Sequence, residues 1–171
     1  MQAKHKFFFS ALAVAFALDV GSKQLVIDHL ARYELAPVIE GFFYLTHVRN
    51  PGAAFSMLAN APDWFRTYFF PGMTIFALGL VISMFRQLKP NERLAACALG
   101  LLLGGASGNL LDRLRHGEVV DFLHVVLWGG RSWPDFNFAD SFIVIGVGLL
   151  IFEMFASEGE TLESDRPAGA A

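Results

Sequence analysis

The sequence has little charge: only 17% of its 171 residues are Asp, Glu, Lys or Arg. Soluble domains carry about 25% charged residues. Here 54% of the residues are hydrophobic and the mean hydropathy is +0.46. The shortage of charge therefore excludes an ordinary soluble domain and indicates a membrane protein. The formal net charge of -3 gives no excess of positive charge, so it argues against a nucleic-acid partner.

Cysteine is almost absent as well. Cys97 is the single cysteine, which excludes an internal disulfide and a cluster of thiolate metal ligands. It lies in an apolar run, so a buried structural thiol is the expected role. The HExxH, CxxC, P-loop and dinucleotide-binding patterns do not occur. We therefore expect no bound metal and no cofactor.

The chain does contain four long apolar segments, and a membrane core of about 30 Å takes about 20 helical residues. Gly100, Gly104 and Gly108 recur at every fourth position of the third segment, a spacing that suits close helix packing. Pro71 is expected in the first turn of the second segment, where it is tolerated. We expect one membrane domain over 1–171, with spans at about 7–27, 67–85, 94–111 and 138–156.

The long segment 30–66 between the first two spans is mixed in composition. Residues 42–48 are aromatic and β-branched, which predicts a strand, and residues 38–39 are a candidate partner strand across Gly41. The expected fold class is thus an all-α integral membrane protein of four transmembrane helices with a small extracytoplasmic β-containing segment. The acidic tail 157–171 is expected to be disordered.

Basic residues near the span ends predict the orientation, because Lys and Arg favour the cytoplasmic side. Four spans place both termini on one side of the membrane and the segments 30–66 and 112–137 on the other. The basic residues that assign the termini to the cytoplasm are Lys4, Lys6, Arg86, Lys89 and Arg93.

Asp121 and Asp140 are the candidate catalytic residues. They flank a short polar stretch between the third and fourth spans, so folding can bring them face to face. Two close carboxyl groups push their pKa values apart, and one ionised and one protonated carboxyl can activate water. The alternative is that Asp121 is a solvated loop residue and Asp140 caps a helix, which is the commoner role of such aspartates.

Two other polar features accompany this pair. Asp19 and Lys23 lie four residues apart on one helix face, so they can form an ion pair inside the first span. We expect that pair to be structural. Gly52 and Ala53, in the stretch NPGAAFS, are small enough to let the backbone approach a ligand, although the stretch also fits a simple loop.

With these positions marked, the chain resembles the lipoprotein signal peptidase (signal peptidase II) family. The resemblance covers almost the whole chain. Four ordered motifs carry it: D-x-x-x-K at Asp19 and Lys23, N-x-G-x-A-F-S at 50–56, G-N-x-x-D-R…G-x-V-V-D-F at 108–122, and F-N-x-A-D at 136–140.

The resemblance implies an aspartic endopeptidase of the bacterial inner membrane, with its active site at the outer leaflet. Its substrates would be diacylglyceryl-modified prolipoproteins, cleaved just before the lipidated cysteine, and it would be inhibited by globomycin. Asp121 and Asp140 would be the catalytic dyad. Residues that line the site and hold the substrate or the aspartates would be Asn50, Asn109, Arg113 and Asn137.

Two other functions compete with this one. The stretch 105–108, GASG, matches the GxSG of rhomboid serine peptidases, but the fourth span has no histidine to activate Ser107. A small ion-coupled transporter could use Asp19, Lys23 and Asp140, but the inner halves of the spans carry no polar chain apart from Glu153. A flux assay in liposomes set against a peptide-cleavage assay separates the transporter from a peptidase.

Overall fold

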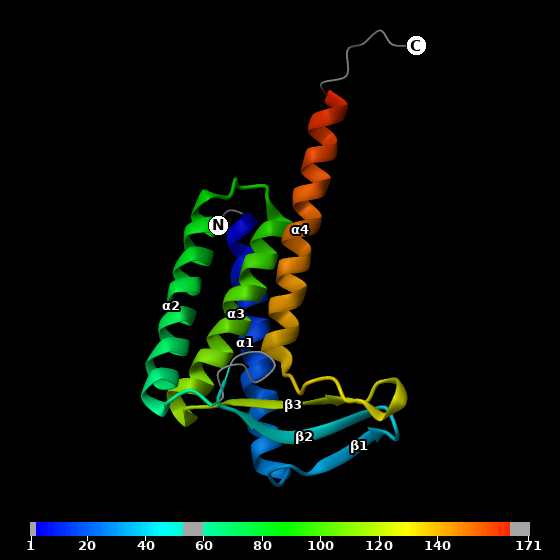
Figure 1. The fold of residues 1–171 in the computed structure, drawn as a ribbon. Coiled ribbons are helices and arrows are strands. Elements are labelled where there is room, and N and C mark those ends of the chain that lie inside the picture. Colours follow the sequence, from blue (N-terminus) through cyan, green and yellow to red (C-terminus); the bar gives the residue numbers. More distant parts are fainter. Residues whose placement is uncertain (1–2, 53–59, 165–171) are drawn as a thin grey trace.

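The computed structural model describes residues 3–52 and 60–164, with side chains to residue 156. Four helices stand side by side and a small sheet lies across one end of them (Figure 1). The helices are α1 (Ala3–His29), α2 (Asp63–Gln87), α3 (Arg93–His116) and α4 (Phe138–Ser164). The strands are β1 (Leu35–Ile39), β2 (Phe43–Asn50) and β3 (Val119–Val125). All four helices are long and apolar enough to cross a membrane, which confirms the predicted fold class.

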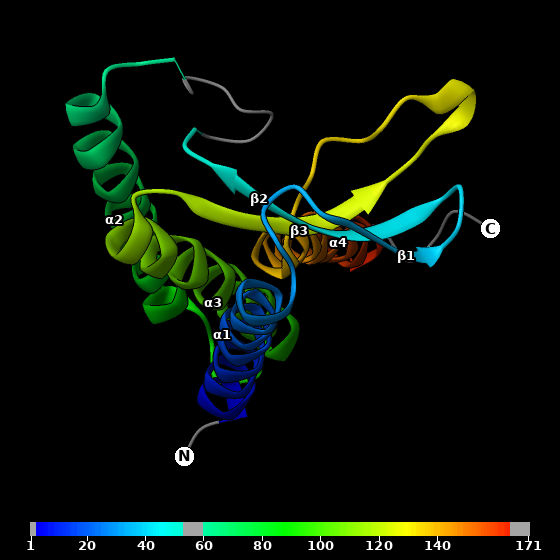
Figure 2. The ribbon, with the colours of Figure 1, turned by 90° about the horizontal axis from the view of Figure 1, so that it is seen from below.

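α3 lies at the centre of the bundle and packs against each of the other three helices (Figure 2). Its glycines make this possible, because a Cβ at Gly104 would lie 2.7 Å from the carbonyl oxygen of Leu12 on α1. A Cβ at Gly105 would lie 2.6 Å from the carbonyl oxygen of Ala139 on α4. The glycine stripe therefore serves helix packing, as predicted.

The sheet is antiparallel throughout, with the order β1-β2-β3. The predicted hairpin across Gly41 is confirmed by β1 and β2. β3 was not predicted, because Val119–Val125 is almost wholly buried and shows no alternation of polar and apolar residues. It pairs with β2, with Val48 opposite Asp121. Asp121 is therefore a strand residue and not the solvated loop residue of the alternative interpretation.

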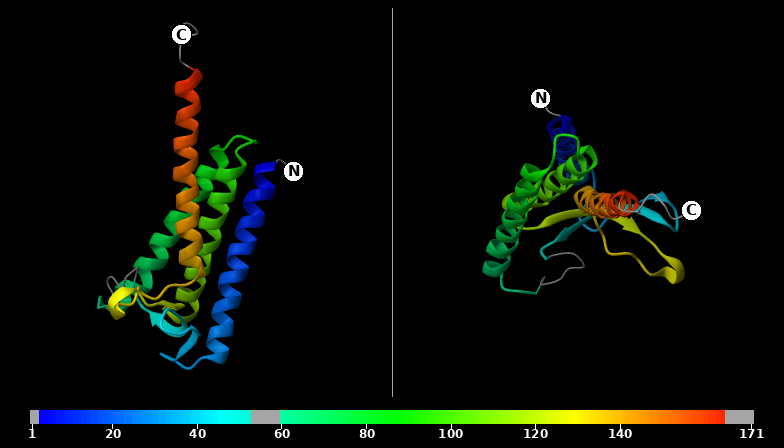
Figure 3. Two further views of the ribbon diagram at one scale, coloured as in Figure 1. Left: turned by 90° about the vertical axis from the view of Figure 1, so that its right-hand side faces the viewer. Right: turned by 90° about the horizontal axis from the view of Figure 1, so that it is seen from above.

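The helices are longer than the apolar segments that predicted them. α2 begins at Asp63, so Pro71 lies inside the helix and not in its first turn. α4 continues to Ser164, beyond the span predicted to end at residue 156, and residues 165–171 lie outside the described part of the chain. The left view of Figure 3 shows α4 extending well past the other helices at the end away from the sheet.

The two ends of the bundle differ in chemistry. The N-terminus and the α2–α3 turn lie at one end, and the sheet lies at the other (Figure 1). An apolar cluster of α1, α2 and α3 fills the first end, where Phe8 stacks on Phe85 with ring centroids 4.0 Å apart. Buried polar side chains gather at the sheet end, namely Asp19, Lys23, Asn109, Asp112, Asp121 and Asn137.

Candidate active site

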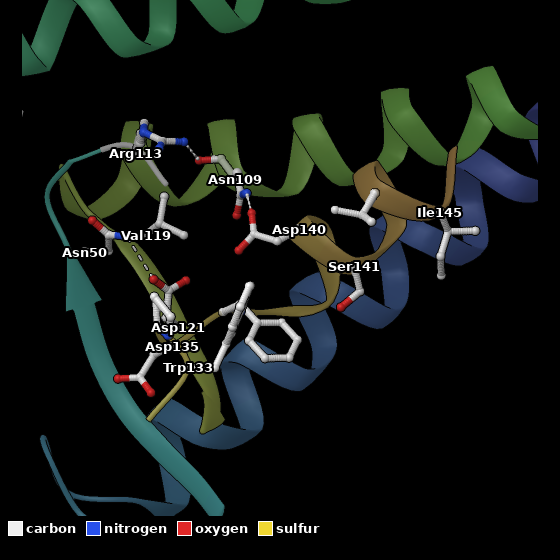
Figure 4. A pocket seen from close by; sticks show the side chains of 13 residues that line it. Asn50, Asn109, Arg113, Val119, Asp121, Trp133, Asp135, Asp140, Ser141 and Ile145 are labelled. Atoms are coloured by element: carbon white, nitrogen blue, oxygen red, sulfur yellow. Dashed lines mark hydrogen bonds between the residues drawn. The ribbon is translucent and has the colours of Figure 1, made fainter. Parts of the chain in front are cut away.

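Asp121 and Asp140 face one cavity of about 510 Å³ at the sheet end (Figure 4). Asp121 lies within β3, and Asp140 lies in the first turn of α4. The backbone of Phe136 pairs with Leu123, so the segment before α4 runs along β3. That pairing brings the start of α4 close to Asp121, so the carboxyl groups at the two ends of this loop share one site.

Asn137 connects the two carboxyl groups. Its side-chain Nδ2 donates to Asp121 Oδ1 at 2.7 Å. Its Oδ1 accepts the backbone N–H of Asp140 at 3.0 Å, while its own N–H donates to Asp140 Oδ2 at 3.3 Å. This reciprocal pair is a capping box at the start of α4. Asp140 therefore does take part in helix capping, and the same cap fixes it relative to Asp121.

Two further amides complete the hydrogen bonding of the pair. Asn50, at the end of β2, donates from Nδ2 to Asp121 Oδ2 at 3.0 Å. Asn109 of α3 donates from Nδ2 to Asp140 Oδ1 at 2.9 Å. Each oxygen of both carboxyl groups thus accepts one N–H. These N–H donors hold the carboxyl groups in place and favour their ionised forms, while the amides themselves do not titrate.

Asp121 is buried, with 3% of its surface exposed. Burial raises the pKa of the Asp121 carboxyl from 3.8 to about 7, and the negative charge of Asp140 acts in the same direction. The hydrogen bonds from Asn50 and Asn137 and the positive charge of Lys23 oppose this rise. The Asp121 carboxyl can therefore hold or release a proton near neutral pH, as a group active in acid–base chemistry must.

Arg113 closes one wall of the cavity. Its guanidinium donates to the carbonyl oxygens of Gly52 at 3.2 Å and of Asn109 at 3.3 Å. The guanidinium carbon also lies 5.4 Å from the ring centroid of Phe70 on α2, a cation–π contact. Arg113 thus ties the end of β2 to α3 and α2 while it faces the cavity.

A second, mostly apolar cavity of about 400 Å³ lies beside the first, and Asn109 and Arg113 line both of them. Its other walls come from α2, α3 and α4. A ligand with a polar part and an apolar part could therefore contact both cavities at Asn109 and Arg113.

The family model of signal peptidase II matches residues 11–156. The chain belongs to this family. The lipoprotein signal peptidase of Geobacter metallireducens is 43% identical over 158 residues, which make up 92% of this chain and 96% of that protein. The lipoprotein signal peptidase of Yersinia pestis (strain Pestoides F) is 47% identical over 150 residues, 86% of this chain and 85% of that protein.

Solved structures agree with the family assignment. One, described as a bacterial membrane enzyme at 2.3 Å resolution, has a TM-score of 0.79 and 28% identity and covers 96% of this chain and 94% of that chain. A second bacterial membrane enzyme, at 1.9 Å, has a TM-score of 0.75 and 31% identity and covers 86% and 91%. The chain is therefore an aspartic-type membrane peptidase of the signal peptidase II family, which confirms the predicted resemblance and class of enzyme.

The structure brings most of the predicted site residues of this signal peptidase II chain together. The predicted residues that line the cavity or bond directly to its carboxyl groups are Asn50, Asn109, Arg113, Asp121, Asn137 and Asp140. Gly52 contributes its carbonyl oxygen to Arg113. Ala53 lies outside the described residues. Lys23 Nζ lies 2.8 Å from Asp19 Oδ2, so these two residues do form the predicted ion pair.

Sequence reasoning missed two features of the site. Asp112 Oδ2 lies 3.1 Å from Lys23 Nζ, which enlarges the predicted ion pair to a group of three. Near the end of β3, His124 Nδ1 lies 2.7 Å from Asp135 Oδ1, and His124 Nε2 lies 3.1 Å from Ser132 Oγ. Asp135 lines the cavity, so this contact fastens the cavity wall to the sheet. The eleven-residue separation of His124 and Asp135 carried no signal that they would meet.

Proposed function

We propose that this chain removes signal peptides from diacylglyceryl-modified prolipoproteins, with Asp121 and Asp140 as the catalytic dyad. The observation that carries the proposal is the shared cavity, in which Asn137 bonds to both carboxyl groups. The names of the relatives, lipoprotein signal peptidases, support the choice of substrate.

In the proposed reaction the dyad starts with one proton, held on Asp121 because burial favours its neutral form. Asp140, ionised, takes a proton from a water molecule that attacks the scissile carbonyl carbon, while Asp121 donates its proton to the carbonyl oxygen. Asp140 then gives its proton to the leaving nitrogen as the C–N bond breaks. Asp121 recovers a proton from the tetrahedral intermediate, so the dyad ends as it began.

We further propose cytoplasmic termini in the bacterial inner membrane, with the sheet end at the outer leaflet. The exposed tryptophans support this depth, since Trp64, Trp128 and Trp133 all lie at the sheet end, and tryptophan favours the membrane interface. A lipid-anchored substrate would present its scissile bond at the same depth. The apolar cavity beside Asn109 and Arg113 offers room for part of an acyl chain.

The dyad is tested with Asp121→Asn and Asp140→Asn in purified enzyme. Each should lower the rate of prolipoprotein cleavage by about 10²–10⁴-fold, because neither variant can complete the acid–base pair. The double variant should be no slower than either single variant, since the residues act as one unit. Binding of the lipidated substrate or of globomycin serves as the folding control.

Two matched controls sharpen this test. Asp28→Asn removes an exposed carboxyl from α1, and Ser107→Ala removes the serine that a rhomboid-type mechanism would need; both should keep activity. An unlipidated twin of the substrate should be cleaved poorly. Substantial turnover by either dyad variant would remove that aspartate from the mechanism.

The orientation is tested by cysteine labelling of intact cells. Asn60→Cys, in a chain whose Cys97 is replaced by alanine, should react with a membrane-impermeant thiol reagent from outside, because Asn60 is exposed just before α2. Labelling of this position only after the cytoplasmic face is opened would reverse the proposed orientation.

A further inference from the structure

Lys23 is a buried cation at the centre of the polar end, with 2% of its surface exposed. Its Nζ contacts Asp19 Oδ2 at 2.8 Å and Asp112 Oδ2 at 3.1 Å, and it donates to Asn109 Oδ1 at 2.8 Å. Three groups from α1 and α3 therefore meet at one ammonium. A buried cation of this kind needs such partners, because leaving it unpaired would cost several kcal/mol.

The two carboxylates on Lys23 each hold one further backbone group. Asp19 Oδ1 accepts the N–H of Ala139 at 2.8 Å. Asp112 Oδ2 accepts the N–H of Val120 at 3.1 Å. Ala139 and Val120 are the residues immediately before Asp140 and Asp121. The same ammonium thus reaches the backbone beside both candidate catalytic residues, through two carboxylates that the proposed chemistry does not use.

A third connection runs through Asn109. Lys23 donates to its Oδ1, and its Nδ2 in turn donates to Asp140 Oδ1. Asn137 Nδ2 also contacts Asn109 Oδ1 at 3.2 Å. Lys23 therefore orients the amide of Asn109, because an oxygen that accepts from an ammonium leaves the NH₂ group to face Asp140.

We propose that Asp19, Lys23 and Asp112 form a brace that sets both the separation of Asp121 and Asp140 and the number of protons they share. The inference rests on the proposed dyad and adds three positioning residues to it. The brace fixes the separation through the Ala139 and Val120 backbone. It sets the proton number through charge, because its two carboxylates and its ammonium are buried, so water screens their effect on the dyad only weakly.

The charged groups around the dyad come from every element packed against it. α1 supplies Asp19 and Lys23, α3 supplies Asp112 and Arg113, and the segment before α4 supplies Asp135. β2 supplies His47 and Arg49, and Arg49 Nε donates to His47 Nε2 at 3.2 Å. β3 itself supplies His124, which contacts Asp135. With the brace and Arg113 fully ionised, two negative and two positive charges balance beneath the dyad. Removing any one of these four charges leaves a net charge, and this net charge shifts the protonation equilibrium of the dyad.

The sign of that effect differs between brace residues. Asp112→Asn removes a negative charge, which favours ionisation of the dyad, so the whole pH–activity profile should move to lower pH. Lys23→Met removes a positive charge and should move the profile to higher pH. Each shift should be about one pH unit, since a charge at this range and burial changes an ionisation by that order.

Of the two variants, Asp112→Asn separates the effect of charge from the effect of lost contacts better. In the structure both partners of Asp112, the Lys23 ammonium and the Val120 N–H, contact the same oxygen, Oδ2. An asparagine that keeps its oxygen there retains both contacts and loses only the charge. Asp28→Asn is the matched control, because it removes an exposed carboxyl from α1, and its profile should not move.

The experiment measures kcat and KM of the purified enzyme on a lipidated prolipoprotein from about pH 4 to about pH 10. Opposite shifts for Asp112→Asn and Lys23→Met, with kcat affected more than KM, support the brace. A loss of kcat with an unmoved profile, or shifts of the same sign, would show that these residues only stabilise the fold. If Lys23→Met does not fold, an unmoved Asp112→Asn profile alone overturns the proposal.

The two proposals fail in different ways. Turnover by Asp121→Asn or Asp140→Asn contradicts the dyad, whatever the brace variants do. Inactive dyad variants together with unmoved brace profiles leave the dyad intact and contradict the brace alone.

Discussion

α2 and α3 are nearly equal in length and in apolar character, yet they hold opposite places in the molecule. Their most apolar windows have mean hydropathies of 1.8 and 1.7, but 11% of the α2 window is buried against 50% of the α3 window. α3 carries Asn109, Asp112 and Arg113 into the site. α2 contributes apolar side chains to the cavity walls, among them Phe70.

The difference lies in the small residues. Gly104 of α3 meets α1 closely enough that an added Cβ would clash, whereas a Cβ at Gly72 or Gly79 of α2 would meet nothing within 4 Å. In lipid the hydrophobic effect does not drive helices together, so their association depends on close packing of the backbones. The helix whose small residues allow this close packing therefore takes the central place. Hydropathy therefore locates the spans, and the small residues decide which span can carry a polar site.

The largest effect should come from the polar groups of α3. Asn109→Ala removes the donor to Asp140 and the acceptor for Lys23, so we expect kcat to fall by about 10²-fold through misplacement of the dyad. Ser83→Ala on α2 is the control, because the exposed Ser83 side chain contacts Gln87 of the same helix and lines neither cavity. Equal losses from both variants would contradict the contrast between the helices.

Stability provides the next test. Gly104→Ala adds a methyl group 2.8 Å from Ala15 Cβ, and overpacking of this kind costs about 1–3 kcal/mol. Gly79→Ala adds the same methyl group to open space and should be neutral or slightly stabilising. Thermal unfolding of both variants in the same detergent compares them directly. A lower melting temperature for Gly79→Ala than for Gly104→Ala would invert the assigned roles.

The raised pKa of Asp121, in the site that α3 supports, should also make the stability of the protein depend on pH. The pKa of Asp121 is about 7 in the folded chain against 3.8 ordinarily, so between these values the folded state holds a proton that the unfolded chain has released. This contribution is complete below 3.8 and is lost as the pH rises through about 7. The melting temperature of the wild type should fall across that window.

Asp121→Asn is the control for that pH dependence. The variant has no carboxyl to titrate at this position, so its melting temperature should change less between about pH 4 and about pH 8. Parallel curves for the two proteins would show that Asp121 titrates normally in the folded chain.

The smallest effect is expected at the cavity wall. His124→Ala breaks the contact with Asp135, which is partly exposed and therefore contributes at most about 1 kcal/mol. KM should rise modestly while kcat stays near the wild-type value, because the wall and not the dyad is loosened. Steady-state kinetics separate the two constants, and a large fall in kcat would assign His124 a closer role.

Much of this architecture was predictable from the residues. The four apolar runs predicted the spans, and the order of the polar motifs predicted that Asp121 and Asp140 would meet. Local patterns could not show β3, because a strand buried on both faces loses its alternation. Nor could they show that Asp112 joins Lys23, since that contact depends on how α1 and α3 are rotated about their axes.

The contacts of Asn109 and Arg113 show the same limit of local patterns. The sequence predicts that these two residues line the site and hold the substrate or the aspartates. In the structure the Asn109 NH₂ group donates to Asp140, and the Arg113 guanidinium donates to the Gly52 carbonyl oxygen. The helical spacing fixes which face these residues share, but their partners come from β2 and α4, whose positions only the tertiary fold determines.

The capping box of Asn137 and Asp140 links the stability of the first turn of α4 to the assembly of the site. The first turn of a helix is ordinarily where fraying begins, yet here the groups that prevent fraying are those that hold the carboxyl groups together. Opening of the α4 terminus and loss of the assembled site are therefore a single event. Hydrogen exchange at the backbone amide of Asp140 should therefore measure the fraction of enzyme molecules in which the site is assembled.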